Sequence, residues 1–131
     1  MKCSICKKEI KEHSNNAQPY KSGDCCDECN FKYVLPLRVF LTGSVKDQVL
    51  IISTAGKISY QKIDTDELLL ETSQKIVEGY IEFYPIKDDN FYYLVDEEGI
   101  LQEKKANPLA LKLFNIKVVG TLLVCPKNLL K

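Results

Sequence analysis

Apolar residues in the middle of the chain follow the spacing of β-strands. Val49 to Ile52 form a contiguous apolar run, and residues 58–63 alternate between apolar and polar side chains. Residues 54–57, Thr-Ala-Gly-Lys, separate the two segments and have the composition of a tight turn. The pattern therefore predicts a β-hairpin over residues 48–63, with its second strand half-buried.

A helix is predicted after this hairpin. Asp64 followed three residues later by Glu67 is a pattern typical of helix starts, and we expect the helix to cover residues 64–78. Gly79 is expected to end it. The residues expected to face the core are Leu69, Ile76 and Val77.

A second hairpin and a further helix are predicted in the rest of the chain. Residues 80–86 and 91–96 are strand-like on either side of a strongly polar turn. Asn107-Pro108 is a capping residue followed by proline at the first helical position, so a helix is expected to about residue 114. Residues 116–124 are the last predicted strand, broken at Gly120. The order β-β-α-β-β-α-β predicts a small α+β domain over residues 44–131.

The first third of the chain is predicted to end in a helix that starts at Cys26. Asp27 and Glu28 would lie in its first turn, where acidic residues favour the helix dipole. Pro36 should kink or interrupt this helix, and Gly43 should stop it. An approximate apolar stripe at helical spacing consists of Phe31, Val34, Leu35 and Leu41.

Cysteine spacing adds chemistry to this picture. Cys3 and Cys6 form one Cys-x-x-Cys pair, and Cys26 and Cys29 form another. Four thiolates make a closed structural zinc site, whereas catalytic zinc usually keeps one position open. We therefore predict one structural Zn²⁺ per chain rather than the disulfides of a secreted scaffold.

Two residues are alternative ligands. Cys25 could replace Cys26 in a Cys-x₃-Cys pair with Cys29, and His13 is the only histidine in the chain. Cys26 is favoured because its spacing places the second ligand one turn into the helix. Cys25 would then be a spare thiol, either packed or redox-sensitive, and the packed state is favoured. Cys125 is expected to be a buried structural cysteine.

The order of these parts predicts a treble-clef-like zinc finger over residues 1–43. Turn-forming residues at 14–16 and 22–24 indicate a small hairpin between the two cysteine pairs. The metal would replace the hydrophobic core that about 40 residues can hardly build alone. A change in composition at residues 42–44 marks the predicted boundary with the α+β domain.

Composition and charge exclude several classes of function. The 131 residues include 18 Lys and Arg against 18 Asp and Glu, whereas nucleic-acid binding normally uses a basic stripe. No apolar run approaches the roughly 20 residues of a membrane span, and no signal-peptide core opens the chain. No phosphate-binding loop or catalytic constellation is visible. We expect a cytoplasmic protein without enzymatic activity.

Half of the aromatic residues fall in the predicted hairpin at 80–96. Strand alternation would place Tyr80, Glu82 and Tyr84 on one face, which could form a surface for a ligand or partner. The competing interpretation is an ordinary aromatic core face with exposed tyrosines. Nearby acidic residues disfavour phosphate backbones as the partner. The candidate surface residues are Tyr80, Glu82, Tyr84, Tyr92 and Tyr93.

Four segments of the second half carry a resemblance to a known family. They are Gly79–Glu82, Asp96–Gly99, Asn107–Ala110 and Val119–Val124. Together, over residues 48–125, they resemble a small domain of unknown function that is common in bacteriophage and mobile-element genomes. The chain departs from the family's usual residues at Asp96, where asparagine is usual, within the third segment and at Thr121.

The first 40 residues look like a treble-clef finger of phage proteins. The pieces that carry this likeness are Asn15–Ala17, Pro19, Gly23, Cys25–Asn30 and Arg38. The two resemblances imply a small phage or prophage accessory protein in the bacterial cytoplasm.

The leading hypothesis is a non-enzymatic zinc protein that binds a host or phage protein, with interference in a host process such as antiviral defence. One alternative is a protein that binds or sequesters a nucleotide or cyclic nucleotide on the aromatic hairpin. Another is a nucleic-acid-binding finger, and a homo-oligomer is compatible with each.

Overall fold

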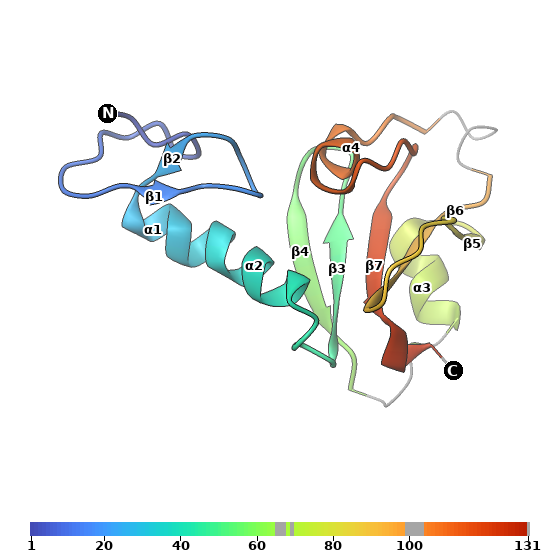
Figure 1. The fold of residues 1–131 in the computed structure, drawn as a ribbon. Coiled ribbons are helices and arrows are strands. Elements are labelled where there is room, and N and C mark those ends of the chain that lie inside the picture. Colours follow the sequence, from blue (N-terminus) through green and yellow to red (C-terminus); the bar gives the residue numbers. More distant parts are fainter. Residues whose placement is uncertain (65–67, 69, 99–103, 131) are drawn as a thin grey trace. The chain divides into compact units, whose positions relative to one another are not determined.

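The computed structural model describes residues 1–64, 68, 70–98 and 104–130. The chain divides into two compact units, Met1–Ser44 and Val45–Lys131 (Figure 1). Each unit has its own cluster of buried apolar side chains. The described part of the chain contains no helix long and apolar enough to cross a membrane.

The first unit is a short hairpin followed by a helical segment. Strand β1 (Asn15–Asn16) pairs antiparallel with β2 (Asp24–Cys25). The helical segment comprises α1 (Asp27–Cys29), the π-helix η1 (Asn30–Val34) and α2 (Leu35–Leu41).

Pro36 lies in the first turn of α2, where its missing N–H group is tolerated. The Leu35 N–H just before it bonds to the Asn30 carbonyl, five residues back, so a π turn makes the transition into α2. The helix ends before Gly43, whose positive φ of 79° is the left-handed stop that the sequence predicts.

The predicted apolar stripe of this helix is wrong in part. Phe31 is 78% exposed and Leu35 is 37% exposed, although Val34 is buried as expected. The residues that α2 buries are Leu37 and Phe40. A 3.6-residue period extrapolated from Phe31 loses its register across the π turn, because each π bond spans one residue more than an α-helical bond.

The second unit is built on a five-stranded antiparallel sheet in the order β4-β3-β7-β6-β5. Its strands are β3 (Gln48–Ile52), β4 (Ile58–Lys62), β5 (Ile81–Phe83), β6 (Phe91–Asp96) and β7 (Leu122–Pro126). Two helices, α3 (Leu70–Val77) and α4 (Pro108–Phe114), and a 3₁₀ turn, η2 (Lys127–Leu129), complete it. The predicted fold class is confirmed: an α+β chain with a cysteine-rich hairpin before a β-β-α-β-β-α-β sheet unit.

Residues on both faces of β3 and β7 are buried, which explains the contiguous apolar runs in these two strands. One face of the sheet packs against α3. The alternate residues of β3 and β7 point to the other face and are buried there. On that other face, the Tyr93 ring meets the Phe114 ring of α4 with centroids 5.5 Å apart. The buried residues on the α3 side include Val49, Val77, Leu94, Leu123 and Cys125.

Helix α3 differs from its prediction at both ends. Asp64 is not helical and the helix begins at Leu70, while Glu67 and Leu69 lie outside the described residues. At the C-terminus, Glu78 takes the positive φ of 59° that Gly79 was expected to take. The helix therefore ends at a glutamate in the left-handed conformation, which residues other than glycine rarely adopt.

The last strand also begins later than predicted. Strand β7 starts at Leu122, after Gly120 with its φ of +77°. Ile116 is fully buried although it lies outside the sheet. Residue 116 is apolar because its side chain is buried, and not because it pairs in the sheet, so the sequence pattern there resembles that of a strand.

Candidate metal centre

Four cysteines from two distant segments converge in the first unit. The Sγ atoms of Cys3, Cys6, Cys26 and Cys29 all lie within 4.8 Å of one another. Cys3 and Cys29 are buried, Cys26 is half-buried and Cys6 is exposed, so the cluster lies at the edge of the unit. The structure thus brings together the four residues that the spacing favours.

The first pair is held by a tight backbone turn. The Lys7 N–H donates to the Cys3 carbonyl at 3.0 Å, and Lys7 itself has a φ of 68°. The Ile5 and Cys6 N–H groups both point at the Cys3 sulfur, each at 3.4 Å. Backbone donors of this kind stabilise negative charge on a thiolate.

The second pair is positioned by the hairpin and the helix start. Cys26 has an extended backbone and precedes α1, and its carbonyl accepts from the Asn30 N–H at 2.9 Å. The Ser4 N–H donates to the Asp24 carbonyl at 2.8 Å, which joins the first turn to β2. The hairpin therefore fixes the separation of the two pairs.

The spacing of the sulfurs suits a tetrahedral metal. Sulfurs held about 2.3 Å from a tetrahedral zinc lie about 3.8 Å apart. The Cys6 and Cys26 sulfurs are 3.8 Å apart. The four cysteines could hold one metal ion, and an all-thiolate donor set belongs to thiolate-preferring metals.

Two of the four thiols, Cys3 and Cys29, have pKa values shifted in opposite directions. Burial opposes ionisation of Cys3, but the backbone N–H groups that donate to its sulfur, that of Cys6 foremost, lower its pKa to about 6. Burial and the neighbouring thiols raise the pKa of Cys29. A cation at the centre would favour the thiolate form of all four.

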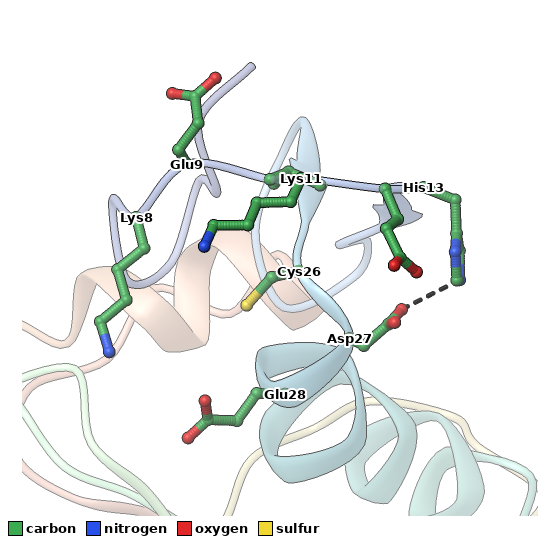
Figure 2. A pocket seen from close by; sticks show the side chains of 9 residues that line it. Lys8, Glu9, Lys11, His13, Cys26, Asp27 and Glu28 are labelled. Carbon is green, nitrogen blue, oxygen red and sulfur yellow. Dashed lines mark ion pairs between the residues drawn. The ribbon is translucent and has the colours of Figure 1, made fainter.

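The two alternative ligands lie outside the cluster. Cys25 is fully buried and belongs to the apolar packing around Ala17 and Val34, where burial raises its pKa. His13 is 69% exposed, and its Nε2 lies 3.0 Å from a carboxylate oxygen of Asp27 (Figure 2).

A shallow hollow of about 380 Å³ lies beside Cys26 (Figure 2). Its charged side chains carry both signs, so it presents no single-sign surface to a ligand. The residues that line it are Lys8, Glu9, Ile10, Lys11, Glu12, His13, Cys26, Asp27 and Glu28.

The five candidate residues of the aromatic hairpin do not form one surface. Tyr93 is only 5% exposed, and its hydroxyl donates to Asp88 at 2.7 Å. Tyr92 lies on the opposite face of β6, because consecutive strand residues point to opposite sides. Its ring pairs with that of Phe83 instead, with centroids 5.4 Å apart.

The remaining three candidates divide between two hollows. Glu82 and Tyr84 line a hollow of about 190 Å³ together with Glu97. Tyr80 lines a different hollow beside α3. Tyr80 precedes β5 and lies next to the end of α3, so neither hollow brings Tyr80 and Tyr84 together.

A buried ion pair that the sequence pattern did not indicate lies at the end of α3. Lys104 Nζ pairs with the Asp96 carboxylate and also donates to the carbonyls of Val77 and Glu78, at 3.0 and 2.9 Å. A Cβ atom on Gly79 would lie 2.5 Å from Asp96 Oδ1. Two of the four resemblance segments, those containing Gly79 and Asp96, thus meet in space.

Comparison with known proteins gives a family for the second unit. No curated protein matches the chain, and no solved structure matches it. Residues 45–128 match the family described as Domain of unknown function (DUF3846), in agreement with the resemblance over residues 48–125, and the chain belongs to this family.

Proposed function

We propose that the protein is a non-enzymatic, zinc-stabilised binding protein. The observation that carries this proposal is the cluster of four cysteine sulfurs within 4.8 Å of one another. Four protein ligands complete a tetrahedral zinc and leave no position for a substrate or an activated water. The ion would order the first unit, and the function would lie in the surfaces of the two units.

The partner we propose is another protein. Equal numbers of basic and acidic residues, 18 of each, give no electrostatic basis for binding nucleic-acid phosphates. A nucleotide stacked on the aromatic hairpin has weaker support, because the five candidate residues do not share one surface. By its resemblance to phage and mobile-element domains, the protein would act in the bacterial cytoplasm on a host protein, for example one of antiviral defence.

The metal part of the proposal is tested by comparing two neighbouring cysteines. Protein purified without chelator should contain about one zinc per chain. Cys26→Ser should abolish stoichiometric binding, because it removes one of the four thiolates. Cys25→Ser is the matched control and should keep the metal, since Cys25 is buried outside the cluster. Elemental analysis measures the zinc content of both variants, and equal content in the two would contradict Cys26 as a metal ligand.

The binding part is tested by capture from a bacterial lysate. Zinc-loaded protein with a terminal tag should retain a specific host protein that is absent from tag-only controls. Cyclic nucleotides and mononucleotides are screened in parallel by thermal shift. Stabilisation by a nucleotide without protein capture would reverse the order of the two hypotheses.

A further inference from the structure

Strand β5 (Ile81–Phe83) is an outer strand of the five-stranded sheet. On its inner side, the Tyr84 N–H donates to the Tyr93 carbonyl at 2.8 Å, and the Tyr80 carbonyl accepts from the Glu97 N–H at 2.7 Å. Hydrogen-bonded pairs alternate along an antiparallel ladder. The N–H and C=O groups of Ile81 and Phe83 therefore point away from β6.

These outward groups have no hydrogen-bond partner among the residues that the structure describes. Such a row of backbone donors and acceptors is a template for another strand. The Phe83 side chain is 56% exposed, so the edge is also open to solvent.

The face of β5 that carries Glu82 adds an acidic hollow to this edge. Glu82 and Glu97 line the hollow together with Tyr84 and three valines, Val95, Val118 and Val119. Lys117 is the one cationic side chain among its lining residues. The carboxylate of Asp96, which also lines the hollow, is already paired with Lys104, so the two glutamates carry its unpaired negative charge. The hollow of about 190 Å³ suits the cationic end of a lysine or arginine side chain.

The opposite face of β5 is apolar. The Phe83 and Tyr92 rings lie in contact there, with centroids 5.4 Å apart, and Tyr92 is itself partly exposed. Cross-strand neighbours share a face, so residues that pair with Ile81 and Phe83 would lie beside these rings.

We propose that the β5 edge binds an extended segment of a partner protein as an additional strand, with the pattern apolar–basic–apolar. The basic residue lies opposite Glu82 and reaches the acidic hollow, while its two apolar neighbours pack beside Phe83 and Tyr92. Opposite Glu82 the new pair lacks mutual hydrogen bonds, which brings its Cα atoms to about 4.5 Å and its side chains close together. This inference rests on the proposed function, because it names the surface at which a protein partner binds.

A second copy of the chain fits the same edge poorly. Antiparallel pairing of Ile81–Phe83 with itself would place Glu82 opposite Glu82, and like charges directly opposite each other are destabilising. Charge complementarity therefore selects a basic segment from another protein.

The experiment uses the full zinc-loaded chain and two synthetic probes. One probe is a short capped peptide that alternates valine and lysine, and the other replaces every lysine by glutamate. The lysine peptide should bind and should slow amide hydrogen exchange at Ile81 and Phe83, whose N–H groups become bonded. The glutamate peptide should bind at least about fivefold more weakly, as expected for one cross-strand charge pair of about 1 kcal/mol.

Charge reversal makes the test specific to the edge. Glu82→Lys should weaken the lysine peptide and strengthen the glutamate peptide, which inverts the preference. The matched control is Glu71→Lys, the same change on the exposed side of α3, and it should leave the preference unchanged.

Three results would overturn the inference: no binding of the lysine peptide at millimolar concentration, an unchanged preference in Glu82→Lys, or protection that maps away from β5. If the protein instead forms a dimer as its concentration rises, and amide hydrogen exchange slows at Ile81 and Phe83 in that dimer, the edge would bind a second copy of the chain. If the lysate capture succeeds and Glu82→Lys captures as much as the wild type, this inference fails while the proposed function stands. If the capture itself fails, the proposed function fails.

Discussion

Gly79 is required by what lies next to it rather than by its backbone angles. A Cβ atom at this position would lie 2.5 Å from Asp96 Oδ1, closer than real side chains approach. The Asp96 carboxylate cannot move away easily, because Lys104 pairs with it and its Oδ1 accepts from the Glu98 N–H at 2.9 Å. The site therefore combines a helix end, a turn and an ion pair in one tightly packed group.

Gly79→Ala should lower the free energy of unfolding by about 3 kcal/mol, since it either overpacks this group or breaks the buried pair. Gly56→Ala is the matched control. Gly56 has a φ of +80° but nothing within 4 Å of its added Cβ, so only backbone strain of about 1 kcal/mol is expected. Urea denaturation of both variants measures the difference, and equal losses would show that the Asp96 contact carries no cost.

Residue-scale features were predictable where they depend on local spacing. Cys3, Cys6, Cys26 and Cys29 were identified because two ligands three residues apart can converge on one ion without knowledge of the fold. Gly79 was predicted from its place after the helix, but glycine is required there because the Asp96 carboxylate of β6 lies against it. Such a contact is set by the β5–β6 register and leaves no local pattern.

At the scale of elements, α4 and β6 were predicted well because their termini are chemically marked. Helix α4 begins after Asn107 with Pro108 at its start, and strand β6 is bounded by a polar turn and by acidic residues. The starts of α3 and β7 were placed too early for different reasons. The capping pattern at Asp64 does not start α3, which begins at Leu70. The last strand was extended over Ile116, which is buried although it lies outside the sheet.

Asn107 joins α4 to the sheet as well as capping it. Its Oδ1 accepts from the Ala110 N–H at 3.1 Å, while its Nδ2 donates to the carbonyls of Ile52 and Gly120, each at 2.9 Å. The side chain is buried, so each bond replaces one that water could otherwise make.

Asn107→Ala should destabilise the second unit by about 3 kcal/mol, because it removes the cap and leaves two buried carbonyls without a donor. Asn107→Ser can still cap the helix but is too short to reach both carbonyls, so about 2 kcal/mol is expected. Thermal and urea unfolding followed by circular dichroism compare the two. A loss below about 0.5 kcal/mol in both variants would mean that these bonds are not what holds α4.

At the scale of the whole molecule, the two units differ in what holds them together. The second unit has an apolar core between sheet and helices, in which Val49, Leu94 and Leu123 are fully buried. The buried cluster of the first unit is small and includes Cys3, Cys25 and Cys29 themselves. A unit of this size with so few buried apolar residues depends on a cross-link or a metal for its stability.

Removal of the metal should therefore unfold only the first unit. With a chelator, amide hydrogen exchange should accelerate across residues 1–44, while the strands of residues 45–131 keep their protection. The Cys26→Ser variant without chelator is the control and should show the same division. Loss of protection at Val49 or Leu123 on chelation would show that the metal also stabilises the second unit.

Cys25 and Cys26 give the metal cluster a consequence for folding. As coordination chemistry, the two adjacent thiols are interchangeable, so the ion alone does not distinguish the native register of β2 from one shifted by a single residue. That degeneracy is resolved by packing, because in the native register Cys25 fills the space between Ala17 and Val34 and leaves Cys26 facing the other sulfurs. A shift that brought Cys25 to the position of Cys26 would bring Asp24 to the buried position of Cys25, and burial of an unpaired carboxylate is unfavourable. The apolar packing around Cys25 therefore determines which of the two adjacent cysteines, Cys25 or Cys26, is available to bind the metal.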